Sequence, residues 1–325
     1  MTDYPVQLEN VVKRYGAFTA VNDLSFSVAK GEIYGFLGPN GAGKTTTLRM
    51  MLDIVRPSAG RISILGSKSA ISVRRRIGYL PEERGLYRKM KAAQSIAYFA
   101  QLRGLSGREA KRRAHALMKE FGLKEFARSK NEALSKGMAQ KVQLLATIAH
   151  EPELLILDEP FSGLDPINQQ ILEKLIESQR ARGRTIIFST HVMQHAERLC
   201  DRFLIIAKGE KRFEGTLSQA RAGYRSRLHV RSTAPIAAFE ALPAVVSVAL
   251  ERDDGEEKDY DVKLADSADP QDFLQQALAA GLVLTRFEQA GATLHDIFVD
   301  LAGDDGAGAS GENTPRSGRG AEAAQ

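Results

Sequence analysis

Two short segments of the chain carry residues whose types and spacing suit phosphate chemistry. Residues 38–46 read Gly-Pro-Asn-Gly-Ala-Gly-Lys-Thr-Thr and fill every fixed position of the phosphate-binding pattern G-x-x-x-x-G-K-[ST]. Residues 154–160 read Leu-Leu-Ile-Leu-Asp-Glu-Pro, an apolar strand that ends in two adjacent carboxylates. Together the two segments predict that the chain binds a nucleoside triphosphate with Mg²⁺ and has a residue able to activate water.

The composition of the first segment follows from what a phosphate-binding loop must do. Its backbone N–H groups have to point at the β- and γ-phosphates, and glycines leave them accessible because no side chain blocks the approach. A helix is expected to begin near Gly43, so that its N-terminal N–H groups and dipole face the phosphates. Lys44 would supply a positive charge, and the Thr45 hydroxyl would be a ligand of Mg²⁺. The preceding residues 32–37 read as a buried strand.

Length, charge and cysteine content limit the number of domains, the class of partner and the cellular compartment that are expected. The chain has 325 residues, which suits one large domain and a smaller one. Its net charge is +5 with the signs mostly mixed, so the basic clusters at 74–76 and 111–113 are only weak support for nucleic-acid binding. A single cysteine, Cys200, excludes an internal disulfide framework and is compatible with a reducing cytosol. No signal peptide is expected, and the longest apolar runs are too short to cross a membrane.

Alternating apolar patterns predict a parallel α/β core that is interrupted by a helical insertion. Strands are expected at residues 6–14, 24–28, 32–37, 61–65 and 77–80. Helices of the insertion are expected at 92–102, 108–121 and 137–150. Strands at 154–157, 185–189 and 203–207 then alternate with helices at 167–181 and 192–199. The insertion therefore covers about residues 88–150 of a sheet-and-helix core.

The last hundred residues differ in pattern from the core, and a domain boundary is expected near residues 222–224. Beyond it the pattern predicts strands at 227–231, 244–251, 258–264 and 282–288, and helices at 235–241, 270–280 and 293–301. The order β-α-β-β-α-β suggests a small ferredoxin-like unit. We therefore expect a large domain at 1–222, an accessory α+β domain at 223–302 and a disordered tail at 303–325.

Further short motifs lie around these segments in a fixed order. The helical insertion ends in Leu134-Ser135-Lys136-Gly137-Met138. The others are Tyr15 before Gly16, Tyr79-Leu80-Pro81-Glu82, Asp158-Glu159, Ser162-Gly163-Leu164-Asp165, and His191 after Phe188-Ser189-Thr190. With the phosphate-binding loop, this series resembles the motifs of ATP-binding cassette (ABC) ATPases over about residues 6–222. The resemblance implies an α/β fold, the P-loop NTPase cassette with a RecA-like core, an antiparallel β subdomain and a helical signature subdomain, here followed by a small C-terminal α+β domain.

Three positions depart from the usual family pattern. Lys136 and Met138 occupy signature positions where glycine and glutamine are usual, and Glu82 stands where glutamine is usual. Lys136 either adds positive charge near the phosphates or points to solvent, and the sequence leaves both open. A carboxylate at Glu82 can still coordinate Mg²⁺ or its water, but it cannot donate a hydrogen bond as an amide does. Residues 79–87 with this signature resemble ATPases of the ABC-2 exporter group, including sodium-export and drug-export subunits, which often end in a helix like that at 293–299.

The resemblance also implies a role for each motif residue. Two copies would sandwich two ATP molecules, each between the loop of one copy and the signature of the other. The implied ATP-binding residues are Tyr15, Gly38, Pro39, Asn40, Gly41, Ala42, Gly43, Lys44, Thr45, Thr46, Ser135, Gly137 and Asp165. The implied Mg²⁺ ligands are Thr45, Glu82 and Asp158, and the implied catalytic residues are Glu159 as general base, His191 as the sensor of the γ-phosphate and Lys44 as the neutralising charge. His195 matches no motif and is expected to be structural.

The leading hypothesis is the ATPase motor subunit of an exporter that docks under a separate transmembrane permease. With ATP and Mg²⁺ bound it would form a homodimer, or a heterodimer with a related cassette, in the cytoplasm on the inner face of the cell membrane. The alternative is a soluble ABC ATPase that acts on DNA or ribosomes. No nucleic-acid partner is expected, because the chain has one cassette, one cysteine and no heptad run, and residues 251–261 of the accessory domain are rich in acidic side chains. The transported substrate stays open, since in this family the permease contacts the cargo. The exporting direction is implied by the resemblance alone, so import stays open as well.

Overall fold

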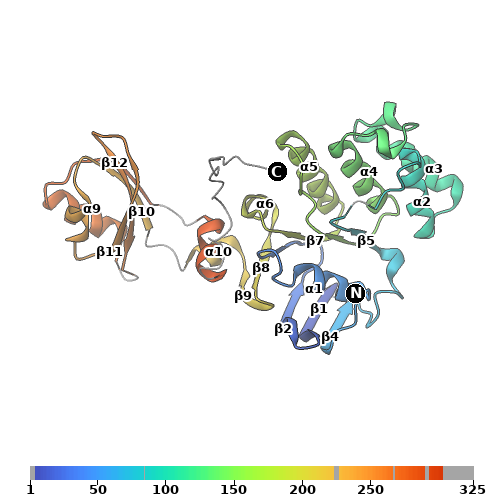
Figure 1. Ribbon diagram of the computed structural model, residues 1–325, viewed down its shortest axis with the longest axis horizontal. Coiled ribbons are helices and arrows are strands. Elements are labelled where there is room, and N and C mark those ends of the chain that lie inside the picture. The colour runs from blue at the N-terminus through green and yellow to red at the C-terminus, as the bar shows by residue number, and fades with distance from the viewer. Residues whose placement is uncertain (1–3, 84, 223–226, 266–267, 290–292, 303–325) are drawn as a thin grey trace, which may run out of the picture.

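The computed structural model describes residues 4–83, 85–222, 227–265, 268–289 and 293–302. Figure 1 shows the helices of residues 92–148 at one end of the molecule, the sheet of residues 227–289 at the other, and the central sheet with its helices between them. The expected disordered tail at 303–325 lies outside the described residues, as do residues 223–226 next to the expected domain boundary. No helix among the described residues is both long enough and apolar enough to cross a membrane.

A three-stranded antiparallel sheet forms one layer of the core, with strand order β2-β1-β4. Its strands are β1 (Val6–Tyr15), β2 (Phe18–Val28) and β4 (Ala59–Ile64). Every second residue of β1 is apolar at its start, so Val6 and Leu8 face the core while Gln7 is exposed. The expected antiparallel β subdomain is therefore present, although β2 begins six residues before the predicted strand at 24–28.

The central sheet has six strands in the order β5-β6-β7-β3-β8-β9. They are β3 (Ile33–Leu37), β5 (Ile77–Leu80), β6 (Leu154–Leu157), β7 (Thr185–Thr190), β8 (Arg202–Ala207) and β9 (Glu210–Gly215). The first five are parallel and β9 is antiparallel to β8. The residues of β3, β6 and β7 are all buried, as expected for strands covered on both faces. Helices α1 (Lys44–Met51), α5 (Pro166–Ala181), α6 (Met193–Leu199) and α7 (Leu217–Ala222) accompany this sheet.

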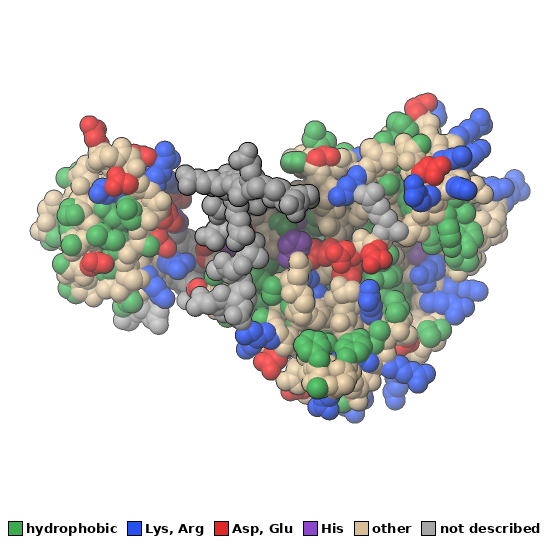
Figure 2. Space-filling model, viewed as in Figure 1, with side chains coloured by type: hydrophobic (Ala, Val, Ile, Leu, Met, Phe, Trp, Pro, Cys, Tyr) green, Lys and Arg blue, Asp and Glu red, His purple; other side chains and the backbone are tan. Residues whose placement is uncertain are grey.

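A helical subdomain lies between β5 and β6, as predicted. It contains α2 (Ala92–Leu102), α3 (Gly107–Glu120) and α4 (Lys136–Ile148), with short 3₁₀ turns at Lys124–Phe126 and Asn131–Ala133 between α3 and α4. A further 3₁₀ turn, Arg74–Arg76, directly precedes β5. The Ser106 hydroxyl accepts a hydrogen bond from the Glu109 N–H and so caps α3. In α3 the buried residues Ala110, Ala114 and Leu117 recur at helical spacing and pack on α2, while Lys and Arg side chains gather on the outside (Figure 2).

The accessory part forms its own four-stranded antiparallel sheet, in the order β11-β12-β10-β13. Its elements are β10 (Arg227–Ser232), α8 (Ile236–Glu240), β11 (Val245–Asp253), β12 (Lys258–Leu264), α9 (Pro270–Ala279) and β13 (Leu284–Gln289). Phe239, Tyr260 and Phe273 are almost completely buried and form a separate core with Leu228 and Val262. The chain order and the central position of β10 are those of a split β-α-β arrangement.

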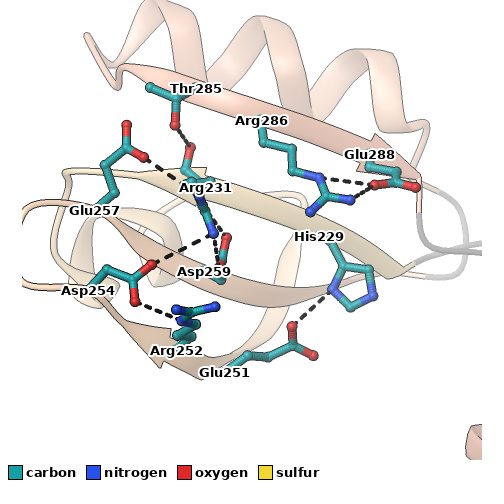
Figure 3. A network of polar contacts seen from close by, with 10 residues as sticks. All are labelled: His229, Arg231, Glu251, Arg252, Asp254, Glu257, Asp259, Thr285, Arg286 and Glu288. Carbon is teal, nitrogen blue, oxygen red and sulfur yellow. Dashed lines mark hydrogen bonds and ion pairs between the residues drawn. The ribbon is translucent and has the colours of Figure 1, made fainter.

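Charged residues occupy the other face of this sheet, where they pair across neighbouring strands (Figure 3). Arg231 of β10 donates two hydrogen bonds to Asp259 of β12, at 2.7 and 2.6 Å, and this contact lowers the pKa of Asp259. His229 lies 3.3 Å from a carboxylate oxygen of Glu251. The acidic run at 251–261 is therefore largely paired with basic side chains, so this face carries mixed charge rather than a negative potential.

The last helix, α10 (Leu294–Ala302), returns to the core. Leu294 and Ile297 are completely buried in a cluster with Met193 and Ala196 of α6. The Leu294 N–H donates a hydrogen bond of 2.6 Å to Glu197 Oε1. The expected boundary groups this helix with the accessory domain, whereas its contacts are with α6, α7, β8 and β9.

Candidate nucleotide-binding and catalytic site

The parallel register of the central sheet brings the predicted catalytic segments to one edge. Leu37 of β3 pairs with Thr190 of β7, and Leu157 of β6 pairs with Phe188 of β7. The residues that follow these strands are therefore neighbours at the carboxyl ends, where open α/β sheets bind ligands. This edge is where the phosphate-binding loop, the two adjacent carboxylates and the predicted sensor histidine meet.

Two glycines of the phosphate-binding loop are required by close packing. Gly43 is the N-terminal cap of α1 with φ of 102°, and a Cβ there would lie 2.6 Å from the Ala20 carbonyl oxygen. A Cβ at Gly38 would collide with the carbonyl oxygen of Ile206. The loop consequently folds back on β2 and β8 without side chains, and α1 begins at Lys44. The predicted strand–loop–helix unit is present with its helix N-terminus at the loop.

Lys44 is buried beneath the loop and lies between backbone carbonyls and a carboxylate. Its ammonium donates hydrogen bonds to Gly38 O at 2.6 Å and to Pro39 O at 3.2 Å. The same nitrogen lies 3.4 Å from Glu159 Oε1. The loop therefore holds a positive charge at its centre, next to the second of the two adjacent carboxylates.

Asp158 and Glu159 are both buried, and Ser189 links them. The Ser189 hydroxyl donates to Asp158 Oδ1 at 2.6 Å and accepts a hydrogen bond from the Glu159 N–H at 2.9 Å. The Thr45 hydroxyl lies 3.4 Å from the same Asp158 oxygen. Burial raises the pKa of Asp158, and the hydrogen bonds from Ser189 and Thr45 oppose that effect. Ser189 was not among the predicted site residues, although its place at the end of β7 beside β6 could have identified it.

The Asp158 and Thr45 oxygens fit a Mg²⁺ ion that also contacts nucleotide phosphates. Asp158 Oδ2 is buried and has no hydrogen-bond partner among the described residues, so this oxygen is available as a metal ligand. Mg²⁺ is usually held by one or two carboxylates together with phosphates and water rather than by a cage of protein ligands. No group of three or more His, Cys, Asp or Glu that could hold a metal occurs in the described part of the chain.

Glu159 has an unusual backbone and a second polar neighbour. Its φ of 46° lies in the left-handed region, which costs a non-glycine residue about 1–3 kcal/mol and is most often found at functional sites. The carboxylate oxygen Oε2 lies 3.0 Å from His191 Nδ1. The imidazole is half-exposed, whereas the Glu159 side chain is buried. Glu159 is thus fixed between the Lys44 ammonium and the His191 ring.

The signature residues form a second cluster with Asp165. Ser135 is the N-terminal cap of α4, and its hydroxyl accepts a hydrogen bond from the Met138 N–H at 3.3 Å. Gly137 packs so tightly on Asn168 that a Cβ would lie 2.5 Å from the amide nitrogen. Asn168 in turn donates backbone and side-chain hydrogen bonds to the Asp165 carboxylate, at 2.9 and 2.5 Å. Asn168 was not predicted, and it joins the two motifs within one chain.

Lys136 lies over the segment that contains Asp165. A side chain at Gly163 would collide with the Lys136 ammonium, because the two groups are in direct contact. Lys136 is nevertheless exposed. Lys136 thus contacts a glycine of the neighbouring motif while its side chain remains accessible to solvent.

Tyr15 and Glu82 stand apart from the cluster around Lys44. Tyr15 is half-exposed at the end of β1, with the Lys13 ammonium 4.8 Å from its ring centre. Glu82 is exposed and forms no hydrogen bond or ion pair with another described residue. His195 is buried, bonds Glu173 at 3.0 Å and stacks on Phe161.

Replacing Asp158 with asparagine is expected to stabilise the protein without nucleotide at pH 7. Burial raises the pKa of Asp158, so ionisation of this group costs stability as the pH rises through that pKa. Asparagine does not ionise, and its gain should vanish at pH 4, where Asp158 is more fully protonated. Urea unfolding at both pH values measures the difference, and Asp300→Asn, at an exposed carboxylate, is the control. A destabilised Asp158→Asn protein at pH 7 would contradict this account.

Comparisons with known proteins agree with these features. The family described as "ABC transporter" matches residues 21–162, and the family "ATP-binding protein DrrA1-3-like, C-terminal domain" matches residues 215–302. The chain is 35% identical over 297 residues to the uncharacterized ABC transporter ATP-binding protein YhaQ of Bacillus subtilis (strain 168), covering 91% of this chain and 98% of that protein. It is 41% identical over 218 residues to the Nod factor export ATP-binding protein I of Burkholderia orbicola (strain AU 1054), covering 66% and 72%.

A solved structure described as the ATP-binding subunit of an ABC transporter superimposes with a TM-score of 0.62 at 36% identity, covering 67% of this chain and 92% of that one. The predicted fold class, an ABC cassette with a C-terminal domain, is confirmed. These relatives are named as transporter subunits, which gives the DNA or ribosome alternative no support. Members of the family bind ATP and are ATPases. The chain therefore belongs to the ATP-binding proteins of ABC transporters, with a DrrA-like C-terminal domain.

Proposed function

We propose that this protein is the ATP-hydrolysing motor subunit of an ABC exporter and that it powers a separate transmembrane permease. The observation that carries the catalytic part is the contact series Lys44–Glu159–His191, with buried Asp158 beside it. It combines a phosphate-neutralising charge, a candidate base and a group able to sense the nucleotide. The family supports the role in a transporter, and the export role named for a relative supports export as the direction of transport.

The catalytic roles follow from these contacts. The N–H groups at the start of α1 and the Lys44 ammonium would bind the β- and γ-phosphates, where positive charge stabilises the transferred phosphoryl group. Glu159 would accept a proton from the attacking water. Its contacts with Lys44 and His191 would hold the carboxylate in a fixed orientation toward that water. His191, half-exposed beside that carboxylate, would contact the γ-phosphate and respond to its loss.

Mg²⁺ would be held by the Thr45 hydroxyl and by Asp158, with Glu82 joining from the loop after β5. The ion would neutralise phosphate charge during the transfer. Ser189 keeps the Asp158 carboxylate oriented by donating to Oδ1, which leaves Oδ2 for the ion or its water. Glu82 is exposed, so its carboxylate is accessible to an ion or to a water bound to it.

Dimerisation would complete each site. Ser135 lies at the N-terminus of α4, whose N–H groups suit a γ-phosphate presented by a second copy. Asp165, hydrogen-bonded to Asn168 against Gly137, would connect that signature with the opposite site. Tyr15, exposed at the end of β1, would stack on the adenine ring. Closure of two copies on two ATP molecules is the motion that would drive the permease.

The docking surface for the permease would be the groove between the core and the helical subdomain. A cavity of about 110 Å³ lies there, lined by residues that follow β5 and by residues of α2 and α4. The lining residues are Tyr79, Pro81, Gly85, Phe99, Arg103, Gln143, Ala146, Thr147 and His150. The surface is mostly apolar and lies next to Glu82, so a helix seated in it would reach the loop that completes the Mg²⁺ shell.

His150, at the floor of this groove, is expected to make the protein sensitive to acid. Burial lowers the pKa of His150 from 6.5 to about 4, and its Nε2 bonds Ile77 O at 3.1 Å. As the pH falls from 6.5 to 4 the unfolded chain binds a proton that the folded chain excludes, which costs about 3 kcal/mol of stability. His150→Gln keeps a donor for Ile77 and should lose less stability between pH 7 and pH 4. Equal pH slopes for wild type and variant, with exposed His115→Gln as control, would refute this.

The rate of ATP hydrolysis as a function of protein concentration tests the motor assignment. A site completed by a second copy predicts a Mg²⁺-dependent rate that rises with the square of the protein concentration at low concentration. Mixing Lys44→Ala with Gly137→Arg, each inactive alone, should restore activity because a mixed dimer contains one intact composite site. A rate strictly linear in protein concentration, with no recovery on mixing, would contradict the shared site.

A further inference from the structure

Positive charge is concentrated in the helical subdomain. Residues 88–150 contain fourteen Lys and Arg and four Asp and Glu, a net charge of +10, whereas the whole chain carries +5. The remaining residues together are therefore net negative. Figure 2 shows these basic side chains gathered over the end of the molecule that α2 and α3 form. Such an asymmetry indicates a surface for an anionic partner rather than a uniformly solvated protein.

Part of this charge lines a groove between α2 and α3. The groove has a volume of about 370 Å³, and its basic lining residues are Lys91, Lys111, His115 and Arg128. The other lining residues are Met90, Ala93, Gln94, Ala97, Tyr98, Gln101 and Ala127, so none of the lining side chains is acidic. Lys111 and His115 are one helical turn apart on α3, which places both along the same wall.

The basic side chains of the groove differ from their neighbours in having no carboxylate partner among the described residues. Nearby Arg113 pairs with Glu151, and Arg182 pairs with Glu120 of α3. Within the described ranges, Lys91, Lys111, His115 and Arg128 form no ion pair, and all four are exposed. Their potential is therefore not cancelled locally, and a phosphate group that enters the groove would meet several donors at once.

Exposed aromatic side chains beside the groove indicate which kind of molecule would carry the bound phosphate. Tyr98, in the groove, packs edge-on against Tyr87, whose own side chain is 56% exposed. Phe126 is 41% exposed next to the lining residues Ala127 and Arg128. Basic residues flanked by exposed aromatic rings suit the headgroup level of a bilayer, because the rings enter the interface while the cations meet phosphates.

We propose that this groove binds the phosphate headgroups of anionic phospholipids, and this rests on the proposed function because a docked permease brings α2 under the bilayer. The permease groove uses Phe99 of α2 and Arg103 directly after it, and the lipid groove uses Gln94, Ala97 and Gln101 on another face of that helix. The helix thus lies between the protein partner and the lipids around it. Each basic residue near an anionic surface contributes about fivefold to binding, so the groove alone gives weak, salt-sensitive attachment that the permease reinforces.

Flotation of the full chain with vesicles tests this proposal without a permease. The vesicles contain either pure phosphatidylcholine or phosphatidylcholine with 30% phosphatidylglycerol. The test variant carries Lys91→Glu, Lys111→Glu and Arg128→Glu. The matched control carries Lys68→Glu, Lys174→Glu and Lys263→Glu, which change the net charge equally at exposed lysines outside the subdomain. The ATPase rate and the melting temperature of each variant report whether the fold is intact.

We expect binding only to the anionic vesicles, about a hundredfold weaker for the groove variant and little changed for the control. Equal binding by the groove variant, or an equal loss in the control, would overturn the proposal. Millimolar inorganic phosphate that displaces the protein completely would indicate a soluble phosphate site, and binding of DNA or RNA in preference to vesicles would indicate a nucleic-acid surface; either result overturns the assignment to lipid. Vesicle binding that depends on the groove, together with recovery of no membrane protein in a pull-down from native membranes, would contradict the transporter role and leave the lipid site standing.

Discussion

Replacing Glu159 with glutamine is expected to lower the ATPase kcat by about 10²–10⁴-fold and to accumulate an ATP-bound dimer. The amide cannot accept the proton of the attacking water, while it keeps the size of the side chain and can still contact His191 and Lys44. Nucleotide binding is retained, because the loop and the helix N-terminus that hold the phosphates are unchanged. Hydrolysis stalls after closure, so the closed state persists.

Light scattering with MgATP and steady-state ATPase assays measure these two effects. Glu177→Gln is the matched control, since this exposed carboxylate of α5 lies outside the site and the same substitution should change neither reading. A Glu159→Gln protein that hydrolyses ATP at the normal rate would remove Glu159 from the role of base.

Replacing Lys44 with alanine is expected to weaken ATP binding by about a hundredfold. The ammonium donates to Gly38 O and Pro39 O and lies 3.4 Å from Glu159 Oε1, so its removal takes away the central positive charge of the loop. It also leaves the Glu159 carboxylate without that cation, beside the place where the triphosphate should lie. Both changes act against an anionic ligand.

Titration calorimetry with a non-hydrolysable ATP analogue and Mg²⁺ measures this loss. Lys174→Ala, at an exposed lysine of α5, is the control and should bind as wild type does. Unchanged affinity in Lys44→Ala would count against phosphate binding at this loop.

The phosphate-binding loop could be predicted from sequence because its chemistry is local. Gly43 needs a left-handed backbone and Lys44 must open a helix, and both requirements appear as residue types in adjacent positions. Asp158 and Glu159 were similarly visible as carboxylates at the end of a short apolar strand. The meeting of these segments followed from the parallel order of the strands.

Ser189, Asn168 and the position of Lys136 depend on contacts between distant segments. Ser189 binds the Asp158 carboxylate across two strands, and Asn168 fills the space beside Gly137 that only a glycine leaves open. Serine and asparagine are common surface residues, so neither carries a pattern of its own. Lys136 covers Gly163 because two loops meet there, which no spacing within either loop reveals.

The elements that the sequence did not predict have weak local patterns. Strand β9 is a polar edge strand, Glu-Lys-Arg-Phe-Glu-Gly, and is stabilised by antiparallel pairing with β8. The first half of β2 contains Asn22 and Asp23, and Asp23 has a positive φ that interrupts the alternation. Helix α10 was predicted, but its docking on α6 through Leu294 and Ile297 depends on a partner surface almost a hundred residues earlier.

The most direct test of the central claim is a pull-down from detergent-solubilised native membranes with tagged Glu159→Gln protein and MgATP, with partners identified by mass spectrometry. Wild-type protein without nucleotide shows how much recovery occurs without the ATP-bound dimer. A variant that also carries Arg103→Glu, in the docking groove, shows whether recovery depends on that groove. We predict recovery of a polytopic membrane protein with Glu159→Gln and its loss with the additional Arg103→Glu change. Recovery of ribosomal proteins or DNA without any membrane protein would contradict the assignment as the motor of a transporter.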